Sequence, residues 1–242
     1  MRYLITLSYD GSKYSGYQKQ IDTKTIQGEL ENALSKLNNK DTSITASGRT
    51  DRGVHAISQC AHFDLDINIT SDKLKMALNS MLPDDIYVKK AEEVSNDFHA
   101  RFNVESKEYI YKINVGEYNP IEKDYIYQYC SDLNIDKMCE AIKIFEGVHN
   151  FKSYVAADDV RDNYVREIIS TNIEKNNNII TITFIGTGFL RYMVRNMVGS
   201  LIEVGEGKKT IADIETILSM EDRKAAGKTA PACGLYLYKV NY

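Results

Sequence analysis

The chain has 242 residues, of which 43% are hydrophobic and 26% are charged, and its formal net charge is −4. This balance is typical of a globular protein, and the length suffices for one large domain or two smaller ones. No apolar run has the length of a signal peptide or a membrane span, and the four cysteines and four histidines lack metal-ligand spacing. We therefore expect a cytoplasmic protein with reduced thiols and without a membrane segment or a bound metal.

The first part of the chain alternates between strand and helix patterns. Thr25 is a candidate N-cap for an amphipathic helix, and Ser71 is a candidate cap for a second one that buries Leu74, Leu78 and Met81. The patterns predict strands at 2–9, 42–45, 54–65 and 86–88 and helices at 26–37 and 71–82.

The second part repeats this alternation. A long helix is expected after Gly188, with Arg191 and Arg195 projecting from the same flank because they are four residues apart. Thr210 and Asp213 resemble a capping box. The patterns predict strands at 107–115, 164–173 and 179–185, helices at 138–145, 190–202 and from 210, and a final strand near 235. We expect two α/β halves, residues 1–103 and 104–242.

One loop carries the most suggestive chemistry. Between two β-prone runs, Gly48 and Gly53 bracket Asp51 and allow a sharp turn, so that the carboxylate is presented at the end of a strand. Arg49 and Arg52 flank it and favour its ionised form, which can act as a nucleophile. The alternative from these residues alone is a turn aspartate that hydrogen-bonds its own backbone between solvated arginines.

A resemblance favours the first interpretation. The run Gly48-Arg49-Thr50-Asp51-x-Gly53-Val54-His55 resembles the signature loop of the TruA family of tRNA pseudouridine synthases, in which the aspartate is the catalytic nucleophile. Tyr17 stands where the family commonly has tryptophan, and we expect its packing to survive. Four further blocks are similar to family segments in the same order, namely 9–18, 97–102 with the following Tyr-x-Tyr strand, 189–199 and 230–237.

The resemblance implies an α+β fold made of two similar halves of mixed β-sheet flanked by helices, with a catalytic cleft between them. It implies an isomerase that converts uridine to pseudouridine at positions 38, 39 and/or 40 of the tRNA anticodon stem-loop. The reaction is redox-neutral and hydrolyses nothing, so no cofactor is expected. The resemblance also implies a homodimer, with tRNA lying across both subunits.

The same resemblance implies roles for Asp51, Tyr109 and Arg195, and the need to extrude the base suggests one for Arg49. Asp51 would be the nucleophile, Tyr109 would stack on the target uracil, and Arg195 would pair with the catalytic carboxylate. Arg49 would fill the space left by the extruded base or hold a phosphate. Attack at uracil C6, attack at ribose C1′ and a route through a glycal all stay open, as does the role of Arg191. His55 is expected to support the loop, and Tyr111 to lie in the core.

The negative net charge argues mildly against an RNA partner, unless a positive cleft lies on an acidic body. We expect such a cleft to include Lys13, Lys19, Arg49, Arg52, Arg161, Arg166, Arg191 and Arg195. Two alternatives remain: a synthase acting on another tRNA or RNA site, and a non-catalytic RNA-binding module. The set of Asp51, Tyr109 and Arg195 favours catalysis, because a carboxylate directed at RNA repels phosphate.

Overall fold

The computed structural model describes residues 1–242 and divides by its internal contacts into two units. The first unit comprises Met1–Glu105 and Tyr236–Tyr242, and the second comprises Ser106–Leu235. The chain therefore passes between the units twice. The expected halves, 1–103 and 104–242, have a similar first boundary, but the end of the chain groups with the first unit.

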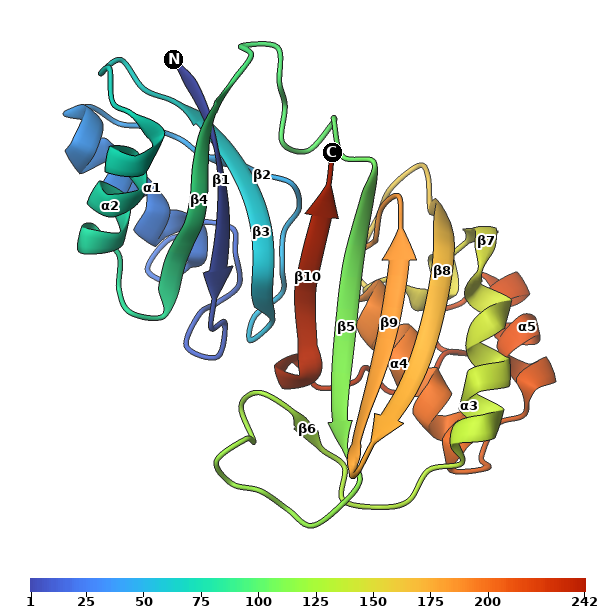
Figure 1. The fold of residues 1–242 in the computed structure, drawn as a ribbon. Helices are drawn as coiled ribbons and strands as arrows, with labels where there is room; N and C mark the ends of the chain where they lie inside the picture. Colours follow the sequence, from blue (N-terminus) through green and yellow to red (C-terminus); the bar gives the residue numbers. More distant parts are fainter. The chain divides into compact units, whose positions relative to one another are not determined.

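The first unit is a mixed β-sheet with helices on one face (Figure 1). Its strand order is β4–β1–β3–β10, with β1 antiparallel to both neighbours and β10 parallel to β3. The short β2 pairs with β3 near the C-terminal end of β3. The elements are β1 (Arg2–Tyr9), α1 (Ile26–Asn38), β2 (Thr45–Ala46), β3 (His55–Asp64), α2 (Ser71–Met81), β4 (Ile86–Val94) and β10 (Leu235–Asn241).

Helix α1 forms where its pattern predicts. The side chain of Thr25 accepts a hydrogen bond from the backbone N–H of Gly28, which confirms the expected N-cap. Ile26, Leu30 and Leu34 are buried, as an amphipathic helix packed on a sheet requires. Asn39 ends the helix in the left-handed conformation, at φ 53°.

Two details of the next elements differ from the pattern. Thr70, not Ser71, precedes α2, and it makes no side-chain capping bond. Met81, expected on the inner face, is 38% exposed, because the buried stripe is carried by Leu74 and Leu78 and ends at Leu82. Strand β4 extends well past Val88 into charged residues, which suit an edge strand because they discourage pairing with another chain.

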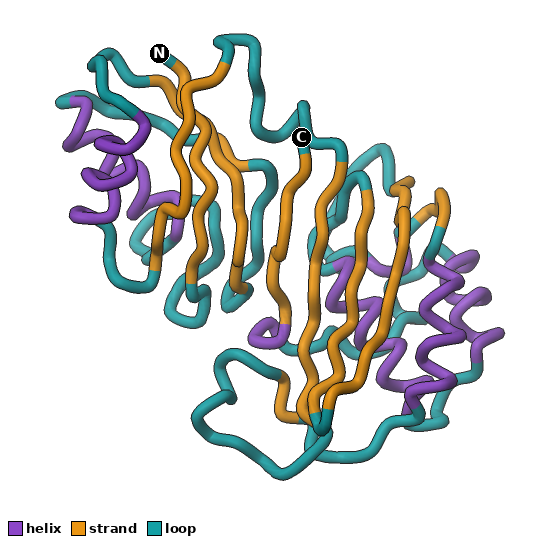
Figure 2. Tube along the Cα trace, viewed as in Figure 1, coloured by secondary structure: helices purple, strands orange, loops and turns teal.

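The second unit is also a sheet with helices on one face (Figure 2). Its strand order is β5–β9–β8–β7, all antiparallel, and the short β6 pairs in parallel with the end of β5. The elements are β5 (Ser106–Asn114), β6 (Tyr127–Gln128), α3 (Ile135–Ile142), β7 (Gly147–Asn150), β8 (Val165–Asn176), β9 (Ile179–Gly186), α4 (Met193–Gly205) and α5 (Ile211–Met220), with 3-10 turns η1 (Lys143–Phe145), η2 (Lys152–Tyr154) and η3 (Ala232–Gly234).

Helix α4 begins later than predicted. Tyr192 takes the left-handed conformation, at φ 64°, so Arg191 lies outside the helix while Arg195 lies in its first turn. The expectation of two arginines on one helix flank is therefore wrong, because the break at Tyr192 interrupts the helical spacing. A positive φ at a bulky residue is uncommon and costs free energy.

The start of helix α5 has the expected cap. Thr210 and Asp213 form the predicted capping box at the start of α5. The four cysteines are free thiols. Every helix falls short of the combination of length and apolarity that crossing a membrane requires.

Candidate active site

The Asp51 loop, residues 47–54, connects β2 to β3. The Ser47 N–H donates to the carbonyl of Cys60 at 2.8 Å, and the Ser47 hydroxyl donates to Gln59 Oε1 at 2.7 Å. The amide of Gln59 in turn donates to the carbonyl of Gly48 at 2.9 Å. Ser47 and Gln59 are fully buried, so these bonds fix the entry to the loop without competition from water.

The residue before the aspartate is anchored on two sides. The hydroxyls of Thr50 and Tyr9 lie 2.8 Å apart in a buried position, and the Thr50 carbonyl accepts the N–H of Tyr17 at 3.0 Å. The N–H of Val54 donates to the Asp51 carbonyl at 3.1 Å and closes the turn. The Asp51 side chain itself is half-buried. The backbone around Asp51 is therefore fixed by hydrogen bonds on both sides of the residue.

The segment between β1 and α1 packs against this loop. A Cβ on Gly11 would lie 2.0 Å from the carbonyl oxygen of Val54. Gly16, at φ 95°, would bring a Cβ to 2.9 Å from the carbonyl oxygen of Thr50. No other residue allows backbones this close. Two blocks that resemble the family, 9–18 and 48–55, thus form one packed pair.

His55 and Tyr17 support this packing. The Gly11 N–H donates to His55 Nδ1 at 3.1 Å, which agrees with the supporting role expected for His55. Tyr17 is 2% exposed and its ring lies 6.4 Å from the ring of Tyr9, so its packing is retained. Its buried hydroxyl has no hydrogen-bond partner, and burial raises the pKa of Tyr17 well above its usual value.

The two arginines of the loop lie in a different environment. Arg49 and Arg52 are exposed on either side of the Thr50–Asp51 backbone. Neither makes an ion pair within the chain. Their side chains are therefore available to solvent or to a ligand.

In the second unit, strand β5 carries Tyr109 and Tyr111. Tyr111 is fully buried and its hydroxyl donates to the carbonyl of Pro231 at 2.8 Å, which confirms the core position expected for it. Tyr109 is 8% exposed, and Phe189 meets its ring edge to face at a centroid distance of 4.9 Å. Phe189 therefore fixes the orientation of the Tyr109 ring.

Arg195 lies in the first turn of α4 and is half-buried. Its Nε donates to the carbonyl of Ala230 at 2.8 Å, and its guanidinium lies 4.9 Å from the Tyr192 ring centroid. Arg191 lies 5.0 Å from the same ring and pairs with Asp158 at 3.0 Å. Tyr192 thus contacts both guanidinium groups.

The electrostatics of this helix end favour an anion. The N-terminus of a helix carries a partial positive charge, where a cation costs about 0.3–1 kcal/mol and an anion is stabilised by a similar amount. The first turn of α4 has no acidic residue and instead contains Arg195. The charge of Arg195 and the helix dipole therefore add, and both attract a carboxylate or a phosphate.

Several residues of the expected positive cleft have acidic partners within their own unit. Lys19 pairs with Glu31, Arg161 with Asp159 and Arg191 with Asp158. Arg166 donates to the carbonyl of Val165. The positive charge that Lys19, Arg161 and Arg191 offer to a ligand is correspondingly reduced. Lys13, Arg49 and Arg52 are exposed and have no such partner.

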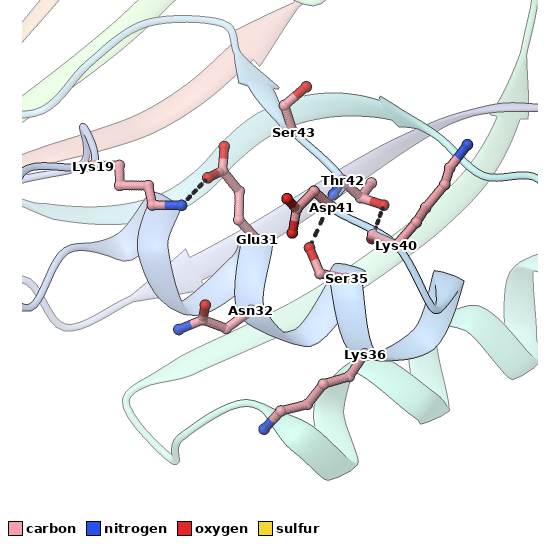
Figure 3. A pocket seen from close by; sticks show the side chains of 9 residues that line it. All are labelled: Lys19, Glu31, Asn32, Ser35, Lys36, Lys40, Asp41, Thr42 and Ser43. Atoms are coloured by element: carbon pink, nitrogen blue, oxygen red, sulfur yellow. Dashed lines mark hydrogen bonds and ion pairs between the residues drawn. The ribbon is translucent and has the colours of Figure 1, made fainter.

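A separate hollow of about 860 Å³ lies between α1 and the segment that follows it (Figure 3). Within it Glu31 accepts from Lys19 at 3.0 Å, and the Thr42 N–H donates to the Ser35 hydroxyl at 2.9 Å. Its other lining residues are Asn32, Lys36, Lys40, Asp41 and Ser43. Apart from Lys19 it contains none of the predicted functional residues, and its central polar groups bond to one another.

Three residues that contact Tyr109 or Arg195 were not predicted from the sequence. Phe189 and Tyr192 lie inside a block quoted for its resemblance, and their aromatic character was the available signal. Ala230 contributes only its backbone carbonyl, which no side-chain pattern can reveal.

The chain contains no group of three or more His, Cys, Asp or Glu residues able to hold a metal ion.

Comparison with known proteins agrees with these observations. Residues 5–103 and 141–242 match the family model described as tRNA pseudouridine synthase. The chain is 44% identical over 239 residues to tRNA pseudouridine synthase A of Geobacillus sp. (strain WCH70), covering 98% of this chain and 96% of that protein. It is 43% identical over 243 residues to the protein of the same name from Pseudothermotoga lettingae, covering 100% and 99%.

A chain of a solved Cbf5-Nop10-Gar1 complex has a TM-score of 0.41 and 12% identity, over 84% of this chain and 45% of that one, which is too distant to add to the argument. The family match and the intact Asp51 loop define a pseudouridine synthase, which is an isomerase. The chain belongs to the tRNA pseudouridine synthase A family.

Proposed function

We propose that this protein converts uridine to pseudouridine at positions 38, 39 and/or 40 of the anticodon arm of tRNA, in the cytoplasm, as a homodimer and without a cofactor. The observation that carries the proposal is the Asp51 loop. Its motif, residues 48–55, is intact. The Thr50 hydroxyl is hydrogen-bonded to the Tyr9 hydroxyl, and the Thr50 carbonyl accepts the N–H of Tyr17. A turn aspartate that only satisfies its own loop would not require this anchoring.

The proposed reaction is an isomerisation. The bond from ribose C1′ to uracil N1 breaks, a bond from C1′ to C5 forms, the C5 proton leaves and N1 becomes an N–H. Asp51 attacks or stabilises the separated fragments, and attack at C6, attack at C1′ and the glycal route remain alternatives for this step. The base must first leave its stack, at a cost of a few kcal/mol.

Three further residues receive proposed roles. Tyr109, whose ring is oriented by Phe189, stacks on the uracil. Arg195 keeps the Asp51 carboxylate ionised, a role supported by its position at the positive end of α4. Arg49, exposed two residues before Asp51, fills the space of the extruded base or holds a phosphate.

The acidic net charge is compatible with this substrate if positive charge is concentrated locally. Lys13, Arg49 and Arg52 supply exposed positive charge around the Asp51 loop, and the N-terminus of α4 adds the partial positive charge of the helix dipole in the second unit. Because phosphate contacts dominate RNA affinity, tRNA binding should weaken steeply as salt rises.

The test is incubation with a panel of unmodified tRNA transcripts that carry uridine at position 38, 39 or 40, followed by pseudouridine mapping at nucleotide resolution. We expect pseudouridine at these positions and at no other. Pseudouridine only elsewhere would assign the enzyme to another RNA site. Binding of tRNA without any pseudouridine would indicate a non-catalytic module and would overturn the proposal.

A further inference from the structure

The segment of residues 222–231, here called the strap, follows α5 and lies against α4. A Cβ on Gly199 of α4 would lie 1.7 Å from the carbonyl oxygen of Lys228. A Cβ on Gly227 of the strap would lie 2.4 Å from Glu203 Oε2 of the same helix. The helix and the strap are therefore in direct contact, and Gly199 allows the close approach of the two backbones.

Arg223 fastens the strap to itself and to the helix. Its Nη1 donates to the carbonyls of Ala226 and Gly227, each at 3.1 Å. Its Nη2 donates to the Thr229 hydroxyl at 2.9 Å and to Asn196 Oδ1 of α4 at 3.0 Å. One planar guanidinium thus holds three strap residues and one helix residue in a fixed arrangement.

The acceptors of Arg223 are neutral oxygens. Burial lowers the pKa of the Arg223 guanidinium, and the field of Glu203 opposes this effect. Partial burial of a cation without a hydrogen-bonded carboxylate costs desolvation free energy. The arrangement therefore points to a need for precise placement of the strap.

Asn196 adds rigidity to the helix side. It is fully buried, and its amide donates to the carbonyls of Tyr154 at 2.7 Å and Val155 at 3.3 Å. Its oxygen accepts from Arg223 and, at 2.6 Å, from the Thr229 hydroxyl. All four hydrogen-bonding positions of this side chain are occupied, so its orientation is fixed.

Near its C-terminal end the strap is hydrogen-bonded to Arg195, the arginine predicted for the active site. The Ala230 carbonyl accepts from Arg195 Nε at 2.8 Å, and the Ala230 N–H donates to the Arg195 carbonyl at 3.1 Å. The adjoining carbonyl of Pro231 accepts from the Tyr111 hydroxyl at 2.8 Å. The direction of the Arg195 side chain is therefore set by a backbone carbonyl whose position depends on the strap.

We propose that Arg223 is a positioning residue for Arg195: it fixes the strap through Asn196 and Thr229, and the Ala230 carbonyl then orients the Arg195 guanidinium. The proposal rests on the function proposed above for Arg195. It predicts that Arg223 contributes to the chemical step through Arg195 alone and makes no contact with tRNA.

The test is a double-mutant cycle measured in single turnover at saturating tRNA, well below the unfolding temperature of each variant. We expect Arg223→Ala to slow pseudouridine formation by about tenfold to a hundredfold, the range that follows misplacement of an active-site group, with tRNA affinity unchanged. We expect Arg223→Ala, Arg195→Lys to be no slower than Arg195→Lys alone. Additive losses, or a loss confined to tRNA affinity, would overturn the proposal.

Two further variants separate positioning from simple destabilisation. Thr229→Val removes one arm of the network with little change in shape and should give a smaller loss of the same kind, even if Arg223→Ala does not fold. Asp213→Ala removes the capping box of α5, which lies outside the strap, and should lower thermal stability without slowing the reaction. A slowed reaction in Asp213→Ala to the same extent would assign the effect to stability and contradict the proposal.

A readout independent of activity separates this inference from the proposed function. The Nε–H of Arg195, observed by nitrogen-edited NMR, should exchange slowly in the wild type and rapidly in Arg223→Ala. Equal exchange in both would refute positioning, whatever the enzyme does to tRNA. Loss of protection, together with a fully active Arg195→Lys, would instead retain the structural link and refute the role proposed for Arg195 in catalysis.

Discussion

The hydroxyl of Tyr9, at the end of β1, lies 2.8 Å from the hydroxyl of Thr50, directly before Asp51. Both residues are buried, so this hydrogen bond joins the centre of the first sheet to the loop that carries the predicted nucleophile. The position of Asp51 therefore depends on a strand distant in sequence. Burial of the Tyr9 hydroxyl also makes the stability of the unit sensitive to alkaline pH.

Replacement of Tyr9 should show that sensitivity. Burial raises the pKa of Tyr9 from 10 to about 12, and the hydrogen bonds of Thr50 and Gln59 oppose the rise. Between these values the unfolded chain releases a proton that the folded protein keeps, so the stability due to Tyr9 falls by about 1.4 kcal/mol per pH unit. Tyr9→Phe should be about 1 kcal/mol less stable than the wild type at pH 8, from the lost bond.

This difference should vanish or reverse near pH 11, because the variant lacks the ionising group. Urea unfolding of both proteins from pH 8 to pH 11 measures it. A difference that stays constant over this range would contradict the assignment.

Gly16 offers a test of the packing under Asp51. Gly16→Ala places a Cβ 2.9 Å from the Thr50 carbonyl oxygen at φ 95°, so the backbone must shift to accommodate it. We expect a loss of about 3 kcal/mol in the free energy of unfolding, together with a large loss of activity. The matched control is Gly207→Ala, at φ 74° with nothing within 4 Å, which should cost only about 1 kcal/mol of strain. Equal destabilisation by both would show that the contact with Thr50 is unimportant.

Local signals in the sequence predicted much of the fold. The Thr25 cap and the Thr210–Asp213 capping box are short-range bonds encoded by neighbouring residues, and both form. The two strands predicted at 164–173 and 179–185 form the β8–β9 hairpin, and Asn177 in its turn adopts φ 52°. The extension of β4 beyond Val88 into charged residues was not predicted, because an edge strand needs no alternation of apolar residues.

The candidate site was less accessible to prediction. Apolar residues Leu190 and Met193 continue the helical pattern across Tyr192, so periodicity could not reveal the left-handed residue that separates Arg191 from Arg195. The contact of Arg195 with Ala230 uses a backbone carbonyl. Such a contact depends on tertiary folding of the strap and leaves no trace in residue types.

Tyr109 allows the stacking role to be separated from any role of its hydroxyl. Tyr109→Phe keeps the ring and its edge contact with Phe189, so we expect a loss of no more than a few-fold in the single-turnover rate. Tyr109→Ala removes the platform, and stacking of a base on an aromatic ring is worth about 1–3 kcal/mol, so we expect a loss of about fivefold to 150-fold. Near-normal activity of the alanine variant would remove stacking from the mechanism.

The most direct measurement of the central claim concerns Asp51. Asp51→Asn keeps the size and polarity of the side chain but removes the charge, and the bonds described above from Ser47 to Gln59, from Thr50 to Tyr9 and from Val54 to the Asp51 carbonyl are made by groups that the substitution leaves in place. Pseudouridine should be mapped in a tRNA with uridine at position 39 after prolonged single-turnover incubation with this variant. The account predicts normal tRNA binding and no pseudouridine above the enzyme-free background; measurable pseudouridine formation would contradict it.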